Sequence, residues 1–196
     1  MKKVYYLLLM LMAMPLGINH IAAQTGSQQT LTQKQIRKAR RQAHAKFMEE
    51  QERLAYTQAV QALKAQSFVV EVDQLIYPRG YVQYVSSATN FIYINQDKAV
   101  IQIAVTNFTP GANGIGGVTV EGIPSNISMS TDKKGNVYFN FVTQGAAISA
   151  TVNIQLTQGD NRATVTIYPN FNSRTLTMTG KVIPYNNSDI FQGSTI

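Results

Sequence analysis

The stretch Ala147–Thr157 reads AISATVNIQLT, and its strict alternation decides the fold class of this chain. Apolar residues stand at every even position from 148 to 156, and polar residues stand at the odd positions. Successive side chains of a β-strand point to opposite faces. The segment therefore predicts a strand with one dry face and one wet face.

The same period of two recurs on both sides of this segment. Further strands are predicted over residues 68–73, 81–86, 90–95, 98–106, 118–121, 127–130, 137–141, 162–167 and 175–181. Short links rich in Gly, Asn and Asp separate several of them and are typical of turns between antiparallel neighbours. The chain is therefore expected to be mainly β, with an antiparallel sheet folded as a sandwich or a partly open barrel.

A helical pattern precedes the strands. Residues 32–66 contain no Gly or Pro and predict one long, basic, amphipathic N-terminal α-helix. Its thin apolar stripe consists of Ile36, Ala39, Ala43, Phe47, Leu54, Ala55, Ala59, Ala62 and Leu63. Eight Lys and Arg residues in this segment face three Glu, whereas seven of each sign balance in the β domain, residues 67–196. Whether the helix packs on the β domain or stands free is left open.

The first 23 residues have the pattern of a signal peptide. Lys2 and Lys3 precede the apolar run Val4–Met14, and Ala23 provides a small residue for cleavage. That run is too short to span a bilayer, which takes about 20 residues. Residues 24–31 form a polar linker. We expect an exported protein, periplasmic or associated with the cell envelope, and not a lipoprotein because the chain has no cysteine to carry a lipid.

Several strings resemble a family of small exported proteins from Gram-negative bacteria, domain of unknown function 4251. They are Phe68–Asp73 (FVVEVD), Tyr84–Ile92 (YVSSATNFI), Gly116–Gly122 (GGVTVEG), Asp132–Asn136 (DKKGN), Pro169–Ser173 (PNFNS) and Gly180–Tyr185 (GKVIPY). The resemblance extends from the helix to the C-terminus. It implies export and a compact, mainly β domain after a helix, and it implies no activity.

A glycine-rich stretch, Thr109–Asn126 (TPGANGIGGVTVEGIPSN), raises the question of a phosphate-binding loop. Such a loop requires a helix after the glycines, whose N-terminus meets the phosphate. Here VTVEG follows, which reads as a strand. We therefore expect a link with a glycine bulge between two strands, and Gly114, Gly116 and Gly117 remain the loop positions to examine for close approach to a ligand.

Catalytic and metal-binding chemistry has little support in the residue types. Glu71 and Asp73 stand two apart in a predicted strand, and with Glu121 they are the carboxylates that a hydrolase would use. After removal of the signal, His44 is the remaining histidine. A zinc site would therefore lack a second histidine ligand, and a hydrolytic triad would have to use this one helical residue. We expect no catalytic residues, no metal and no cofactor.

Two surfaces are candidates for binding. Arg37, Lys38, Arg40 and Arg41 give the helix a basic face suited to peripheral contact with an anionic membrane surface. Nucleic acid is not expected as a partner of an exported protein. The wet face of the C-terminal strands carries Thr, Asn and Gln side chains, and Tyr138, Tyr168 and Tyr185 add aromatic rings if they cluster. Such a surface contacts sugars or another protein, or is simply soluble.

The first functional expectation is a non-enzymatic exported module that binds an envelope protein or a lipid-like, apolar ligand. One alternative is a carbohydrate-active or other hydrolase that uses the three carboxylates. Another is a structural envelope protein that touches the membrane through its basic helix. An apolar cavity inside the β domain would support the apolar ligand, and a filled core would argue against it. Oligomeric state is left open.

Overall fold

The computed structural model describes residues 33–105, 112–146, 148–170 and 175–195. The predicted signal peptide and linker lie outside these residues. Within the described part, no helix is long and apolar enough to cross a membrane. The chain divides inside its first helix into residues 1–40 and 41–196, and the packing below concerns the second unit.

The predicted helix is present as α1, Gln33–Lys64. Two turn residues, Ala65 and Gln66, join it to the first strand, and Gln66 has a left-handed backbone (φ 52°). The apolar stripe does not form one contact face. Ala59, Ala62 and Leu63 are the residues of the helix that are buried, whereas Phe47 and Leu54 are exposed. The helix thus contacts the β-sheet mainly through its last two turns.

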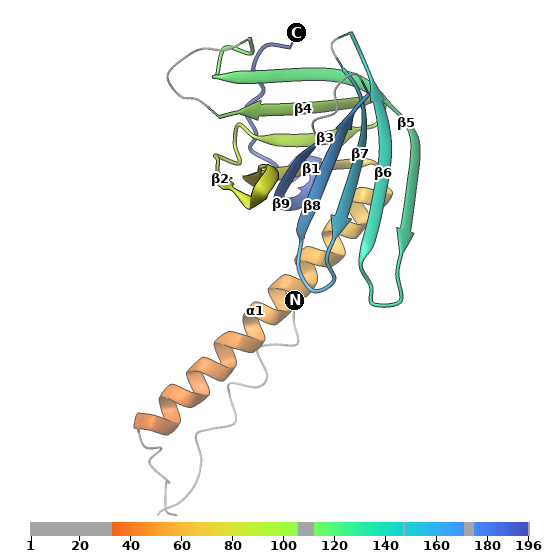
Figure 1. Cartoon of the computed structure of the whole chain (residues 1–196). Coiled ribbons are helices and arrows are strands. Elements are labelled where there is room, and N and C mark those ends of the chain that lie inside the picture. Colours follow the sequence, from red (N-terminus) through yellow and green to blue (C-terminus); the bar gives the residue numbers. More distant parts are fainter. Residues whose placement is uncertain (1–32, 106–111, 147, 171–174, 196) are drawn as a thin grey trace, which may run out of the picture. The chain divides into compact units, whose positions relative to one another are not determined.

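The remainder is a nine-stranded antiparallel sheet, drawn in Figure 1 as strands that curve around one another. The strands are β1 (Ser67–Ile76), β2 (Val82–Tyr84), β3 (Phe91–Asn95), β4 (Lys98–Ala104), β5 (Gly117–Thr131), β6 (Val137–Gln144), β7 (Ser149–Leu156), β8 (Arg162–Pro169) and β9 (Leu176–Pro184). Two short 3-10 helices, η2 (Pro78–Gly80) and η3 (Tyr185–Asn187), complete the elements.

The sheet closes into a barrel because β1 pairs with both β3 and β9. The pairing with β9 runs from Phe68–Pro184 to Ile76–Thr177, with one register shift between Val72 and Gln74. Eight strands therefore form the barrel, and β2 adds an extra strand along the end of β1. A bulge of this kind increases local twist and helps a sheet to close. Of the two predicted architectures, the structure forms the barrel.

One prediction of strand boundaries is wrong. The segments 118–121 and 127–130 are parts of a single 15-residue strand, β5. Its first half pairs with β4 and its second half with β6, and the register shifts between Ser125 and Ser128. Asn126 adopts a left-handed backbone (φ 51°) at this shift. Pro124, which has no N–H to donate, lies just before this shift, opposite Thr143 and beyond the pairing with β4, which ends at Gly122.

Side chains fill the inside of the barrel. The largest of them include three phenylalanines, Phe68, Phe139 and Phe141, and the rings of Phe68 and Phe139 meet edge to face with centroids 5.2 Å apart. Leu63 and Ala59 of α1, both 0% exposed, join the same cluster as the inward residues of the strands. An eight-stranded barrel is just wide enough for side chains to fill. The interior is therefore a solid core that the end of α1 completes.

A second cluster lies outside the barrel, under the C-terminal segment. Val69, Phe91, Tyr93 and Val100 are buried on the outward face of β1, β3 and β4, where Ile183, Tyr185 and Ile190 pack on them. Residues after β9 therefore cover a face that the alternation alone assigns to solvent. Burial raises the pKa of the Tyr93 hydroxyl.

Candidate functional site

The glycine-rich stretch connects β4 with β5, as the pattern predicts, and part of it lies outside the described residues. Gly114 and Gly116 have positive φ (76° and 88°), which glycine adopts without strain. At Gly117 a Cβ atom would lie 1.7 Å from the carbonyl oxygen of Ile103. The β4–β5 register continues without a shift to Ala104 and Gly117, so no bulge occurs in that ladder. These glycines permit a close turn.

A buried amide holds this connection to the C-terminal segment. Gln102, predicted on the wet face, is 0% exposed. Its Nε2 donates to the carbonyl oxygens of Thr89 and Phe191, and its Oε1 accepts from Thr119 Oγ1 (2.7 Å) and the N–H of Gly193 (2.8 Å). The side chain thus has all four of its hydrogen-bonding positions occupied. This network is structural and leaves no polar group free for a ligand.

The loop residue Asn113 extends the same network. Its Nδ2 donates to Thr119 Oγ1, and its Oδ1 accepts from the N–H groups of Ile115 and Gly117. The carbonyl of Asn113 accepts in turn from Ser194. Asn113 is 1% exposed, so the conformation of the loop is held from inside the protein. The described end of this connection, residues 112–116, is therefore held by the buried Asn113 side chain.

The three carboxylates proposed for hydrolysis are engaged with different neighbours. Glu71 Oε1 accepts a hydrogen bond from Ser188 Oγ (2.7 Å). Asp73 forms an ion pair with Arg162 on β8 (2.9 Å). Glu121 forms an ion pair with Lys98 on β4 (2.7 Å). Each carboxylate thus bridges two parts of the barrel, which is an ordinary structural role.

The Lys98–Glu121 pair borders a shallow pocket of about 440 Å³, together with Asp97 and Gly122. The hydrogen bond from Lys98 to Glu121 raises the pKa of the Lys98 ammonium group. Two carboxylates, Asp97 and Glu121, thus line the same pocket, but Glu121 is already paired with Lys98. A general acid also needs an apolar surrounding that favours its protonated form, and this open pocket offers none.

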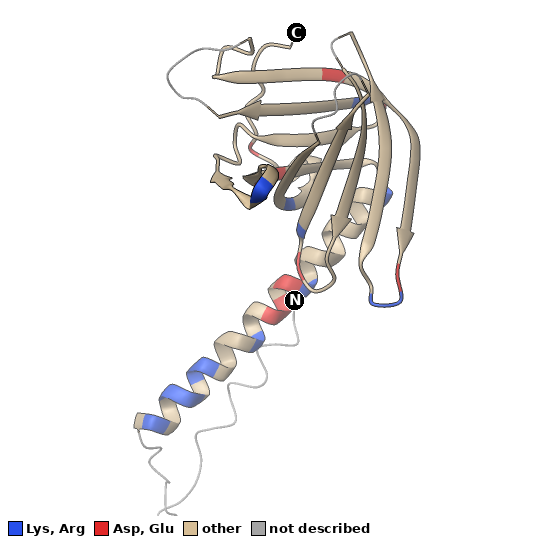
Figure 2. Ribbon diagram, in the orientation of Figure 1, with Lys and Arg blue, Asp and Glu red and all other residues tan. Residues whose placement is uncertain are grey.

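The basic residues predicted on the helix lie where they can meet an external surface. Arg37, Lys38, Arg40 and Arg41 are all exposed. Figure 2 shows Lys and Arg along the first half of α1, followed by Glu residues. Among the described residues, none of the four arginines and lysines forms an ion pair; within α1 that interaction is made by Arg53 with Glu50.

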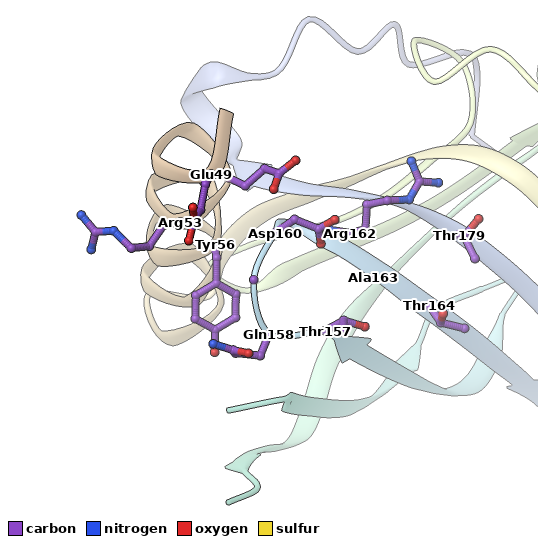
Figure 3. A pocket seen from close by; sticks show the side chains of 12 residues that line it. Glu49, Arg53, Tyr56, Thr157, Gln158, Asp160, Arg162, Ala163, Thr164 and Thr179 are labelled. Carbon is purple, nitrogen blue, oxygen red and sulfur yellow. Dashed lines mark hydrogen bonds between the residues drawn. The ribbon is translucent and has the colours of Figure 1, made fainter. Parts of the chain in front are cut away.

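A cleft of about 710 Å³ lies between α1 and the turn that joins β7 to β8. Figure 3 shows Glu49 and Tyr56 on the helical side and Asp160 on the opposite side, at the turn. Glu52, Thr164 and Thr179 also line it. The Tyr56 hydroxyl donates to the carbonyl of Gly135 in the β5–β6 turn, and so ties the helix to the end of the barrel.

The cleft has an acidic character because its cations are already paired. Arg162 binds Asp73, and Arg53 turns away from the cleft to bind Glu50. Glu49, Glu52 and Asp160 form no ion pair within the described residues. No group of three or more His, Cys, Asp or Glu side chains in the described part of the chain is arranged to hold a metal ion. The charged side chains of the cleft that form no ion pair in the described part of the chain are therefore all acidic.

Apolar side chains are exposed on the same helix. Phe47 is 61% exposed, Leu54 43% and Met48 42%. Leu54 and the buried Leu63 are nine residues apart, which is about two and a half helical turns, so they lie on opposite sides of α1. The exposed part of the apolar stripe around Leu54 therefore faces away from the barrel, whereas its end at Leu63 packs into it. The sequence pattern predicted the stripe, but it did not indicate which residues of the stripe are buried.

Comparison with known proteins identifies relatives of this chain. The pattern of one protein family, described as Domain of unknown function (DUF4251), matches residues 50–182. A crystal structure of a DUF4251 family protein from Bacteroides eggerthii is 49% identical in sequence. That match covers 73% of this chain and 96% of the other, with a TM-score of 0.64. No curated protein matches the chain. The resemblance seen in the sequence is thereby confirmed.

Proposed function

This chain belongs to the DUF4251 family, and on that premise we propose that it is a non-enzymatic, exported binding module whose partner is a protein of the cell envelope. The partner docks on the exposed segment of α1 between Arg41 and Tyr56. The signal-like pattern of the first 23 residues supports export. The observation that carries the proposal is the exposure of Phe47, Met48 and Leu54 on a helix of which only the end is packed.

Exposed apolar residues on this helix have a physical cost. An isolated helix is marginally stable in water unless one face is packed. Aromatic and Met side chains are enriched at protein–protein interfaces. Covering Phe47 and Leu54 with a partner would remove apolar surface from water and stabilise the helix at the same time. The same side chains serve no packing role in the barrel.

The filled barrel favours a protein over an apolar ligand. Phe68, Phe139 and Leu63 occupy the interior, where a lipid-like molecule would have to lie. The acidic cleft adds a second feature on another face of α1, where Glu49 and Asp160 attract basic side chains. Charges of this kind set the orientation and rate of association more than its strength.

The proposal is tested by affinity capture with the tagged chain, lacking residues 1–23, from an envelope extract of the producing cells. The double variant Phe47→Ser/Leu54→Ser is compared with Ile123→Ser, which changes an apolar residue on β5 that is even more exposed (68%). We expect one protein to be retained by the unchanged chain and by Ile123→Ser, and to be lost from the double variant.

Retention of the same proteins by all three chains would contradict a docking role for α1. An equal loss of the captured protein from the double variant and from Ile123→Ser would show that exposed apolar residues of this chain bind proteins non-specifically. Circular dichroism of each chain checks that the helix content is unchanged. The variants replace exposed side chains, so the barrel core is not affected.

A second candidate function rests on the unpaired basic residues of α1. Arg37, Lys38, Arg40 and Arg41 would attract anionic lipid head groups, with a gain of about 1 kcal/mol for each cation near a charged surface. Cosedimentation with vesicles of anionic and of zwitterionic lipid tests it. Binding to anionic vesicles that disappears when all four become Gln supports this function, and binding that is equal for both lipids counts against it.

A further inference from the structure

A third surface adjoins the acidic cleft, with which it shares Thr164, and lies on the outer face of β6, β7 and β8. It is a groove of about 420 Å³. Its lining consists of Tyr138, Asn140, Asn153, Ile154, Gln155, Thr164, Thr166 and Tyr168. We propose that this groove binds a neutral oligosaccharide.

The strand register builds the groove from cross-strand rows. Tyr138 lies opposite Gln155, which lies opposite Thr164. In the next row, Asn140 lies opposite Asn153, which lies opposite Thr166. The residues between these positions, such as Phe139 and Val165, are buried in the barrel. The alternation therefore forces the amide and hydroxyl side chains together on the outer face.

Most polar side chains of the groove have no hydrogen-bond partner among the described residues. Within the described part of the chain, the side chains of Asn140, Asn153 and Gln155 make no hydrogen bond. The same holds for Thr164 and Thr166, and the hydroxyl of Tyr138 has only a long contact of 3.5 Å with Asp132. The structural amides contrast with them, because the side-chain nitrogen and oxygen of Asn90, Gln102 and Asn113 each have a hydrogen-bond partner.

The chemistry of the lining selects the ligand class. Each carboxamide offers both donors and acceptors, and so does each hydroxyl, which matches the hydroxyl groups of a sugar. None of the lining residues is Asp, Glu, Lys, Arg or His. A nucleic acid or another phosphate-bearing ligand would need cations at this place. The groove therefore favours a ligand that is rich in hydroxyl groups and carries no charge.

Two tyrosine rings complete the site. Tyr168 is 44% exposed and Tyr138 is half-buried, at opposite corners of the grid. From standard strand geometry their Cα atoms are separated by about 16 Å. Rings at this separation would contact different units of an oligosaccharide. Aromatic side chains present an apolar face of this kind in many binding pockets. Tyr185, the third tyrosine considered from the sequence, instead packs on Tyr93 elsewhere.

Isothermal titration calorimetry tests the proposal with four neutral probes, namely cellohexaose, xylohexaose, mannohexaose and maltohexaose. We expect saturable binding of at least one probe to the full chain. Tyr168→Ala and the double variant Asn153→Ala/Gln155→Ala should each weaken that binding about tenfold or more. The matched control is Tyr84→Ala, which removes a tyrosine that is 78% exposed on β2 and should change the affinity less than twofold.

Three results would overturn the proposal. The first is no binding of any of the four probes to the unchanged chain. The second is an equal loss of affinity in Tyr84→Ala and in Tyr168→Ala. The third is dissociation of an oligomer by Tyr168→Ala in analytical ultracentrifugation, which would make the groove an interface between copies of the chain.

Discussion

At the scale of single residues, two glutamines show how burial changes the role of one side-chain type. Gln102 and Gln155 both follow an apolar residue in a strand, and alternation places both on the outward face. Gln102 is covered by the C-terminal segment and engages all of its polar positions, whereas Gln155 is exposed and unpaired among the described residues. The difference comes from residues some 90 positions away, which no local pattern contains.

Replacing Gln102 should therefore be costly. Gln102→Ala leaves the buried Thr119 hydroxyl and the N–H of Gly193 without their acceptor, and each such loss costs about 1 to 3 kcal/mol. We expect the free energy of unfolding in urea to fall by about 3 kcal/mol. The control Gln155→Ala should change it by less than about 0.5 kcal/mol. Similar effects of the two substitutions would refute the structural role of the buried network.

Asp132 is the residue whose ionisation should be visible in the folding equilibrium. The side chain of Asn136 donates to Asp132 Oδ2 and, with the N–H groups of Asn136 and Lys134, lowers the pKa of this carboxyl group. A carboxyl group whose pKa is lowered in the folded state stabilises the fold at pH values above its pKa in the unfolded chain, which is about 3.9. This stabilisation is lost as the pH falls below the pKa of the unfolded state and through the lower pKa of the folded state.

The test compares unfolding midpoints of the unchanged chain and Asp132→Ala between pH 7 and pH 2. We expect the unchanged chain to be the more stable at pH 7 and the difference to shrink as the pH falls below about 4. A difference that is constant over the whole range would show that the ionised carboxylate does not contribute. The Asp132 side chain caps the β5–β6 turn, so the variant should keep the barrel.

At the scale of elements, the C-terminal end of α1 packs into the barrel core, whereas the middle of the helix is exposed. Leu63 is 0% exposed in the barrel core, and Leu54 is 43% exposed on the opposite side. Leu63→Ala should reduce the free energy of unfolding by about 2 to 4 kcal/mol, because it leaves a cavity. Leu54→Ala should change it by less than about 0.5 kcal/mol. Thermal or urea unfolding of the isolated protein measures both, and equal losses would mean that the middle of α1 is packed as well.

The sequence predicted the helix and the strands that have a strong hydrophobic period, but it did not predict how the strands pair. The helix begins and ends within two residues of the prediction. The strand β7 follows from its alternation, and so do β6 and β8. Sequence could not choose between sandwich and barrel, because that choice depends on β1 pairing with β9 across the whole domain. The long strand β5 was divided in two because Gly122 and Pro124 resemble a break.

The candidate sites were less predictable than the fold. Glu49, Glu52 and Asp160 meet across a cleft although Asp160 is more than 100 residues distant, and no motif joins them. The nominated carboxylates Glu71, Asp73 and Glu121 are engaged by partners that local sequence does not reveal. The groove on β6–β8 is the exception, because its polar residues follow from alternation and need only the register to bring them together.

At the scale of the whole molecule, the barrel is a closed and filled support, and the surfaces that remain for function lie outside it. The interior is occupied by Phe68, Phe139 and the end of α1. The exposed apolar face of α1 lies on the other side of that helix. The partner protein that we propose would cover Phe47 and Leu54, which would account for the exposure of these apolar side chains. The docking of that partner on α1 is the central claim.

Photo-cross-linking tests this claim most directly. A benzophenone amino acid is placed at Phe47, or at Ile123 on β5 as the control position with similar exposure (61% and 68%). The full chain is then expressed in the producing cells and irradiated. The account predicts a discrete covalent adduct with one envelope protein from position 47 and none from position 123. No adduct from position 47, or the same adduct from both positions, would contradict it.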